Sequence, residues 1–325
     1  MFFDAMFAYT RTAAVKAALQ VELFTAIDEG NQAVPSMATR CRSSERGIAI
    51  LCDYLTVAGF LRKIGDRYAL TQDSAVFLSK RSPAYMGSVA DFLATPELMD
   101  NFHALADRVR TGTMAKAAST VSDDNAVWVP FAKAMTPMMM PTAQAIADVL
   151  QVGTAGPLRV LDIAAGHGIF GIVLAQRNPQ VTVTAVDWAA VLAVATEHAA
   201  QLGVRADRYR TIAGDAFAVD FGIGFDVALV TNFLHHFDRQ TNVAFMRKVH
   251  AALKPGGRAV IVEFVPNEDR VSPAMAASFA IMMLAGTPNG TTYTLNDLKG
   301  IASDAGFTGV TGHPAPPQTV VVLTK

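Results

Sequence analysis

Apolar residues recur every three or four positions along residues 3–28, a spacing that predicts one long helix ending near Gly30. The apolar stripe of this helix comprises Phe7, Val15, Ala18, Leu19, Leu23, Phe24 and Ile27. An isolated monomer of this plan would leave such a stripe exposed to water. We therefore expect the first part of the chain to pack against a second copy, forming a homodimer.

Two shorter helical patterns follow, over residues 35–41 and 44–58. Ser43 or Ser44 is suited to be the N-cap of the second helix, and Gly59 is suited to end it. Residues 60–70 contain two apolar runs around a Gly-Asp pair, which predicts a small β-hairpin. Helix, helix and hairpin in this order predict a winged helix, and we expect the dimerisation domain to span residues 1–95.

A winged helix is also typical of DNA-binding regulators. Its second helix would then enter the major groove and contact phosphates with basic side chains. Residues 45–58 contain one arginine, two acidic residues and a mostly aliphatic face, so phosphate contacts would be few. We favour a dimer interface, and salt-dependent binding to duplex DNA would support the regulator instead.

Residues 84–150 have a helical pattern that is interrupted by a looser stretch from Gly112 to Asn125. A methionine-rich run at 135–141 follows this stretch. Methionine side chains line adaptable apolar pockets, although such a run is also compatible with plain core packing. We expect residues 96–150 to form a helical connector that contributes to a substrate pocket.

From residue 158 onward, short β-branched runs alternate with helical segments. Strands are predicted at 158–163, 181–186, 208–213, 225–231 and 258–264, in the βαβαβ order of a parallel, doubly wound sheet. Two further strands, 307–312 and 318–324, are joined by the proline-rich segment 313–317. That connection is too short for a crossover helix, so the last strand is expected to be antiparallel. The predicted fold is α/β: a Rossmann-like sheet over 151–325 after a mostly helical N-terminal domain.

Composition narrows the class of protein. The 325 residues suffice for about two domains, and 27 basic against 28 acidic side chains give no field for a polyanionic partner. The only cysteines, Cys41 and Cys52, form neither a disulfide framework nor a zinc motif. No signal peptide or stretch of about 18 apolar residues is present. We expect a soluble cytoplasmic protein that binds neither nucleic acid nor membrane.

The strongest local motif runs from Val160 to Gly171, where a strand leads through a glycine turn into a helix. It contains a literal G-x-G-x-x-G at Gly166 and Gly168, and Asp187 follows Gly166 by 21 residues at the end of the next strand. A carboxylate there accepts both hydroxyls of a ribose, so the motif fits NAD as well as S-adenosylmethionine.

Asp162 distinguishes these two cofactors. It ends the first strand just before the glycine turn, where a carboxylate would repel a pyrophosphate and attract the cationic amino-acid tail of S-adenosylmethionine. A carboxylate that only caps the loop backbone is the alternative. After the third strand, Gly214, Asp215 and Phe217 place an acid and an aromatic ring where an adenine edge and face are read. Three acids at successive strand ends favour a ligand site there.

These motifs resemble those of the S-adenosylmethionine-dependent small-molecule O-methyltransferases of the plant caffeate and flavonoid type, with bacterial polyketide-tailoring relatives. The resemblance covers nearly the whole chain. Besides the motifs above, it rests on Trp188, on Asn232 to Phe237, on Leu253 to Gly257, on Glu263 and on Ala305 to Phe307. Their order and spacing together are more specific than any single motif.

The resemblance implies a role for each of these positions. Asp187 would hold the ribose, Asp215 and Phe217 the adenine, and Asp162 with the glycine loop the methionine end. Trp188 would pack beside the adenosine, and Asn232 also falls in the cofactor site. His235 falls at the position of the general base, and Glu263 at that of a carboxylate that orients this histidine.

General chemistry supports the histidine pair. Methyl transfer from a sulfonium is an in-line displacement, and a phenol or alcohol acceptor must lose its proton. Histidine can take that proton near neutral pH, and a carboxylate fixes its tautomer. The family has a second orienting glutamate where this chain has Thr292, so positioning of an already acidic acceptor is an open alternative. His236 replaces an acid of the family and is either a second polar group of the pocket or exposed.

The acceptor pocket is expected between the central helices and the segment from Met275 to Leu284. Such apolar and pliable walls suit a flat or bulky hydrophobic metabolite, aromatic or polyketide-like. C- or N-methylation, or another reaction with the same cofactor, stays open. No metal is expected, because His235 and His236 lack a third ligand. The predicted lining residues are Phe131, Met135, Met138, His236, Met282 and Met283.

Overall fold

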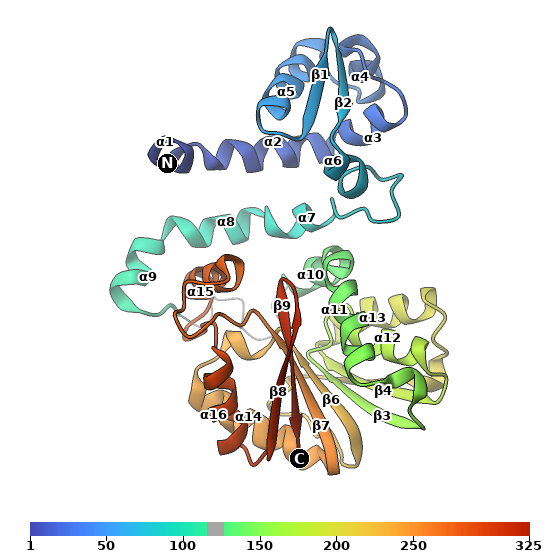
Figure 1. The fold of residues 1–325 in the computed structure, drawn as a ribbon, viewed down its shortest axis with the longest axis vertical. Helices are drawn as coiled ribbons and strands as arrows, with labels where there is room; N and C mark the ends of the chain where they lie inside the picture. The colour runs from blue at the N-terminus through green and yellow to red at the C-terminus, as the bar shows by residue number, and fades with distance from the viewer. Residues whose placement is uncertain (116–126) are drawn as a thin grey trace. The chain divides into compact units, whose positions relative to one another are not determined.

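The computed structural model describes residues 1–115 and 127–325. The chain divides into two units, Met1–Pro96 and Glu97–Lys325 (Figure 1). The expected looser stretch, Gly112 to Asn125, lies mostly outside the described residues. The segment expected to be a helical connector, 96–150, falls almost entirely within the second unit.

The first unit contains the winged helix that the pattern predicts. Its two central helices and hairpin lie within two residues of the expected positions, and the Ser44 hydroxyl caps the second helix by accepting from the Gly47 amide at 3.1 Å. The core combines apolar side chains from α2, α3, α4, α5 and the hairpin. The elements are α1 Phe2–Met6, α2 Ala8–Gln20, α3 Leu23–Asp28, α4 Val34–Arg40, α5 Glu45–Val57, β1 Leu61–Ile64, β2 Arg67–Leu70, α6 Gln72–Phe77 and α7 Val89–Leu93.

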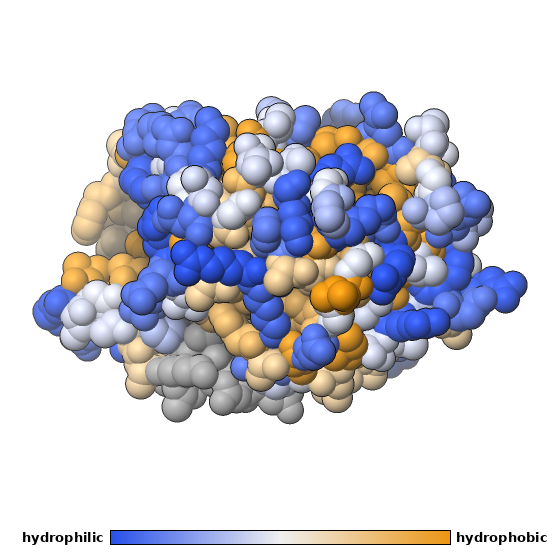
Figure 2. All heavy atoms as spheres, turned by 90° about the horizontal axis from the view of Figure 1, so that it is seen from below, coloured by the Kyte–Doolittle hydropathy of each residue, from blue (hydrophilic) through white to orange (hydrophobic). Residues whose placement is uncertain are grey.

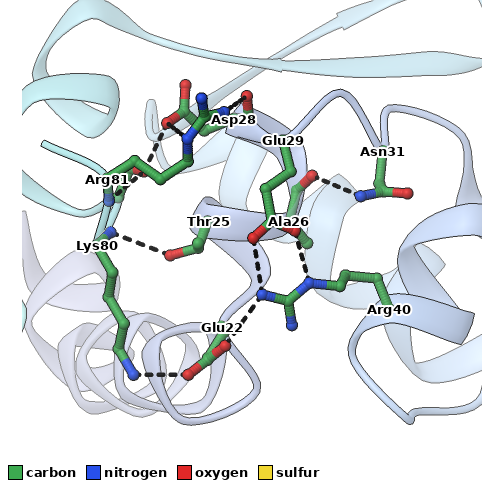
Figure 3. A network of polar contacts seen from close by, with 10 residues as sticks. Glu22, Thr25, Ala26, Asp28, Glu29, Asn31, Arg40, Lys80 and Arg81 are labelled. Carbon is green, nitrogen blue, oxygen red and sulfur yellow. Dashed lines mark hydrogen bonds and ion pairs between the residues drawn. The ribbon is translucent and has the colours of Figure 1, made fainter.

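The prediction of one continuous helix over 3–28 is wrong, because the chain breaks near Phe7 and again at Glu22. Glu22 adopts a left-handed backbone with φ of 58°, which no helix interior accommodates. Its carboxylate accepts from Lys80 at 2.6 Å and from Arg40 at 3.2 Å, and Arg40 also pairs with Glu29 (Figure 3). The ion pairs hold the turn between α2 and α3. Phe7, counted in the apolar stripe, is 59% exposed.

The second unit is built on a seven-stranded sheet with the order β5-β4-β3-β6-β7-β9-β8. The first five strands are parallel, β9 runs antiparallel to β7, and β8 runs antiparallel to β9. The α/β prediction with an antiparallel last strand is confirmed. The strands are β3 Leu158–Ile163, β4 Val181–Asp187, β5 Tyr209–Ala213, β6 Phe225–Thr231, β7 Leu253–Glu263, β8 Gly309–Ala315 and β9 Gln318–Thr324.

Helices cover both faces of this sheet (Figure 1). On one face lie α11, α12 and α13, and on the other α14 and α16. The Thr294 hydroxyl and the Asp297 carboxylate form the expected capping box at the start of α16. The helices are α8 Pro96–His103, α9 Leu105–Thr111, α10 Trp128–Ala134, α11 Thr136–Val149, α12 Ile169–Arg177, α13 Ala189–Gln201, α14 Arg239–Ala252, α15 Ala274–Gly286 and α16 Leu295–Asp304.

Two strand predictions need correction. The strand expected at 258–264 begins at Leu253, because Leu253 already pairs with Phe225. The register then shifts, and regular pairing resumes between Val227 and Arg258. The strand expected at 307–312 runs from Gly309 to Ala315, so only two prolines of the predicted connection form the turn to β9.

The order of the strands creates a switch point between β3 and β6. From β3 the chain adds β4 and β5 on one side, and it then returns to add β6 and β7 on the other. In open α/β sheets, ligands bind outside the carboxyl ends of the strands at such a point. The loops after β3 and β6 therefore mark the place for a site.

Surface and helix properties agree with the balanced composition. Figure 2 shows hydrophilic side chains over much of one face, with hydrophobic ones gathered between them. Within 1–115 and 127–325, no helix is both long and apolar enough to cross a membrane.

Candidate active site

The glycine loop after β3 depends on close backbone packing. Gly168 is the N-cap of α12 and has a φ of 73°, and a Cβ built on it would lie 2.5 Å from the Tyr209 hydroxyl. Gly171 has the same constraint, since its Cβ would lie 2.8 Å from both Asp162 and Val183. Both positions require glycine, which lets the loop and helix pack directly on the strands.

Asp162 lies fully buried beneath this loop. Its Oδ2 accepts from the Gly171 amide at 3.0 Å, while its Oδ1 has no hydrogen-bond partner among the described residues. Burial raises the pKa of Asp162 well above its usual value, and the nearby Asp187 acts in the same direction. The capping alternative therefore accounts for one oxygen, and the other is an orphaned buried acceptor.

Asp187 ends β4 beside the same loop. Its Oδ2 accepts from the Gly166 amide at 2.8 Å, and its Oδ1 accepts from the Trp188 amide at 2.7 Å. Trp188 packs with Trp128 against a small cluster made by α10 and α13. Asp187 thus holds both the glycine turn, through Gly166, and the start of α13, through Trp188.

The loop after β5 joins this arrangement through the backbone, because the Gly214 amide donates to the Asp187 carbonyl at 2.9 Å. Gly214 has φ of 138°. Asp215 accepts from the Phe217 amide at 2.9 Å through Oδ1. The Phe217 ring is 38% exposed and lies 5.9 Å from that of Phe233. An acid and a partly exposed aromatic face therefore stand together at the third strand end.

His235 and Glu263 form a buried pair at the ends of β6 and β7. His235 Nδ1 lies 2.5 Å from Glu263 Oε2, and the two side chains are 5% and 2% exposed. The other carboxylate oxygen accepts from the amides of Phe233 and His235 at 3.2 and 3.3 Å. An ionised carboxylate only accepts, so in the neutral imidazole the proton belongs on Nδ1 and the lone pair on Nε2. This is the geometry a histidine base requires.

His236 is buried, so its interpretation as an exposed residue is wrong. Burial and the neighbouring His235 lower its pKa well below the usual value, which keeps the ring neutral. Its Nδ1 has no partner among the described residues. The ring packs edge-on against Trp128 with centroids 5.4 Å apart, while His235 packs in the same way on Phe279 of α15 at 4.9 Å. Helices α10 and α15 therefore contact the two neighbouring histidines.

The central helices link this region to the glycine loop. Phe131 stacks on His167 with centroids 5.9 Å apart and meets Trp128 edge-on at 5.6 Å. His167 lies in the glycine turn, where burial lowers its pKa to about 3. One helix, α10, thus spans from the turn of β3 to the histidines after β6.

The predicted methionine walls lie on α11, its preceding residue and α15. Met135 and Met283 are buried, whereas Met138 and Met282 are partly buried. Thr292, the position at which the resemblance implies a second glutamate in the family, is 3% exposed.

Several contacts of the site escape local sequence reasoning. Asn232 follows β6 with φ of 54°, and its amide is held by Gln318 on β9 and contacts Met139 Sδ at 3.7 Å. Gln318 sits there only because the antiparallel β9 begins beside the carboxyl end of β7. Trp128 and Phe279 also contact the site only through tertiary packing, and no local motif marks them. Among the described residues, no group of three or more His, Cys, Asp or Glu side chains forms a metal-binding arrangement.

Comparison with known proteins assigns both units. An O-methyltransferase domain model matches residues 102–308, and an O-methyltransferase dimerisation domain model matches residues 3–80. A 3-hydroxy-5-methyl-1-naphthoate 3-O-methyltransferase of Streptomyces sahachiroi is 28% identical over 303 residues, 92% of this chain and 87% of that protein. A tetracenomycin polyketide synthesis 8-O-methyltransferase of Streptomyces glaucescens is 26% identical over 98% of this chain and 94% of that protein.

Solved structures agree with the fold. A crystal structure from Nostoc punctiforme PCC 73102 has a TM-score of 0.95 and 46% identity, covering 100% of this chain and 98% of that one. Human N-acetylserotonin methyltransferase in complex with SAM has a TM-score of 0.85 and 18% identity, over 100% of this chain and 96% of that one. At this identity the likeness concerns the fold alone.

The switch-point sheet, the glycine loop and the acids at successive strand ends define an S-adenosylmethionine-dependent methyltransferase. More narrowly, the chain belongs to the O-methyltransferase family.

Proposed function

We propose that this enzyme transfers the methyl group of S-adenosylmethionine to a hydroxyl of a small hydrophobic metabolite, aromatic or polyketide-like. The observation that carries the proposal is the buried His235–Glu263 pair beside the switch point, with Nδ1 and Oε2 2.5 Å apart. The two Streptomyces relatives named above, which act on a naphthoate and a polyketide, support the acceptor class.

The residues present fit the cofactor. The orphaned Oδ1 of Asp162 is an acceptor that the amino group of a methionine tail can satisfy. We assign Asp187 to the ribose hydroxyls, and Asp215 and Phe217 to the adenine. When bound, S-adenosylmethionine supplies an electrophilic methyl group on a positively charged sulfur. The remaining residues assigned to its site are Gly166, Gly168, Trp188, Gly214 and Asn232.

In this proposal His235 Nε2 removes the proton of the acceptor hydroxyl. Glu263 keeps the Nδ1 proton in place and stabilises the imidazolium that forms. The backbone after β6 is fixed by the same carboxylate through two amides, so the base is held in position before the acceptor binds.

The acceptor is assigned to the space beside α10, α11 and α15. The neutral ring of His236 offers a hydrogen-bonding atom without charge, which suits a neutral oxygenated ring better than an anion. The apolar walls assigned to it are Phe131, Met135, Met138, Met282 and Met283.

A second candidate reaction is C-methylation. Thr292 supplies no charge where the family has its second glutamate. A relative of part of the chain, the L-tyrosine C(3)-methyltransferase of Streptomyces lavendulae, is 26% identical over 56% of this chain and 50% of its own length. Product mass together with the position of the new bond distinguishes methylation at carbon from methylation at oxygen.

We also assign residues 1–95 to dimerisation, 96–150 to the acceptor pocket and 151–325 to the cofactor site. In the first unit, Ile50 and Val57 of α5 are 55% and 88% exposed, which favours an apolar interface over phosphate contacts. Sedimentation that shows a stable monomer at micromolar concentration contradicts the homodimer. Salt-sensitive retardation of duplex DNA contradicts the assignment of no nucleic-acid partner.

Calorimetric titration tests the cofactor assignment. The wild-type protein is expected to bind S-adenosylhomocysteine and not NADH, and Asp187→Ala is expected to abolish that binding. Asp207→Ala, which removes an exposed carboxylate paired with Arg205, is the matched control. Binding of NADH alone would overturn the proposal. Labelled cofactor with a panel of phenols and hydroxy acids then identifies the acceptor, and a panel without any methylated product contradicts the acceptor class.

A further inference from the structure

The loop after β5 is a tight turn built around Asp215. The Phe217 amide donates to the Asp215 side chain, and the amides of Ala218 and Val219 both donate to its carbonyl at 2.9 Å. Three successive N–H groups are thereby used on one residue. The carbonyl groups of the same turn need other donors.

Lys248 of α14 supplies those donors. Its Nζ donates to the carbonyls of Ala216, Phe217 and Val219 at 2.9, 2.9 and 2.6 Å. An ammonium group has three donors and no acceptor, so all three are engaged. The cation also lies 4.3 Å from the centroid of the Phe221 ring. One side chain therefore binds the loop along most of its length.

Phe245 contacts the same loop from the same helix. It lies three residues before Lys248 and therefore on the same face of α14. Its ring is 5.0 Å from that of Phe217. Helix α14 begins at Arg239, directly after the His235 segment, so it connects that segment with the loop after β5.

We propose that Lys248 is a positioning residue for the adenine of the cofactor. The inference rests on the function proposed above. By holding three carbonyls, Lys248 fixes the turn so that the second carboxylate oxygen of Asp215 and the ring of Phe217 present a preformed surface to the base. Asp215 Oδ2 has no partner within the described residues and is available to the adenine amino group.

The first test is the affinity for S-adenosylhomocysteine after Lys248→Met, which keeps the stem and removes the donors. Loss of three charge-assisted hydrogen bonds in the loop is expected to raise the Kd by about tenfold or more. The KM for S-adenosylmethionine is expected to rise in parallel, while kcat at saturating cofactor stays within about twofold. Lys299→Met, at an exposed lysine on α16, is the matched control and is expected to bind like the wild type.

A chemical rescue separates positioning from general stability. Both native cysteines are buried, so in Lys248→Cys the new thiol is the one open to alkylation by 2-bromoethylamine. The thiolate displaces bromide, and the product carries an ammonium at the reach of lysine. Binding is expected to weaken in Lys248→Cys and to recover after alkylation.

The ratio of the affinities for S-adenosylhomocysteine and S-inosylhomocysteine is a measurement that a purely structural role of Lys248 would leave unchanged. S-inosylhomocysteine carries an oxygen where adenine has its amino group. If the anchored turn reads that group, Lys248→Met lowers the ratio of the two affinities toward one. Unchanged affinity in Lys248→Met, equal weakening of both ligands, or no recovery after alkylation overturns the inference. A wild-type protein that binds neither ligand instead overturns the proposed function, and with it the role of Lys248.

Discussion

Replacing Glu263 by glutamine tests the catalytic assignment with almost no change in shape. The carboxylate now accepts three hydrogen bonds, two from amides and one from His235 Nδ1. In the amide, one oxygen can keep the two backbone donors, but an NH₂ group then faces Nδ1. Two donors cannot bond to each other, so His235 is expected to move its proton to Nε2. The ring stays in place and loses the Nε2 lone pair to which the acceptor proton is assigned.

The magnitude follows from this change of tautomer. A positioned general base contributes about 10²- to 10⁴-fold, so kcat in Glu263→Gln is expected to fall by that range. Loss of the charge-assisted bond costs about 2 kcal/mol of unfolding free energy. For a unit of this size that corresponds to a Tm lowered by roughly 4–8 °C. The protein is therefore expected to remain folded at assay temperature.

Single-turnover methyl transfer from labelled cofactor is the appropriate assay, because it separates chemistry from product release. Glu268→Gln, at an exposed carboxylate five residues further on, is the matched control and is expected to keep full activity. If Glu263→Gln retains its rate within about threefold, His235 is not the base and the acceptor reacts by positioning alone. If the Kd of S-adenosylhomocysteine rises as steeply as the rate falls, Glu263 acts on the cofactor instead.

Three further predictions concern the rest of the chain. His167 has a pKa of about 3 in the folded protein against 6.5 when unfolded, so the stability it contributes is fully present above pH 6.5 and falls on acidification, by about 2 kcal/mol at pH 5. In His167→Asn, the slope of the unfolding free energy against pH, measured by urea unfolding over pH 5–7, is expected to decrease by an amount equivalent to up to one proton. An unaltered slope contradicts this. Gly168→Ala is expected to cost about 2–4 kcal/mol in urea unfolding, from a left-handed backbone and the contact with Tyr209, and a neutral effect refutes the packing argument. Arg40→Gln is expected to lower the Tm of the protein at low salt and to lower it less at 1 M salt, since salt screens the partly exposed pairs that Arg40 forms with Glu22 and Glu29; a loss that does not depend on salt contradicts an electrostatic role.

The sheet was predictable because its strands are short, apolar and bounded by helical segments. The N-terminal helix was not, because its break at Glu22 is held by ion pairs between Glu22 and two residues far along the chain, Arg40 and Lys80. Periodicity reports which face is apolar, but it carries no information on which carboxylate a distant cation reaches.

The site shows the same division. Residues at strand ends were found because parallel strands bring their carboxyl ends together, whatever the tertiary detail. Gln318 lies 86 residues from Asn232, and Trp128 and Phe279 reach the histidines from separate helices. Only packing brings them there, so no local spacing identifies them.

The place of β9 in the sheet has a consequence for biosynthesis. This strand follows β8 in the chain, yet it lies between β7 and β8 in the sheet. During translation, β8 has no strand to pair with, and the edge of β7 stays open until residues 318–324 have left the ribosome. The growing chain therefore exposes the apolar edge of β7, which is buried in the finished protein, until the end of β9 is made, and during this interval it depends most on protection from aggregation.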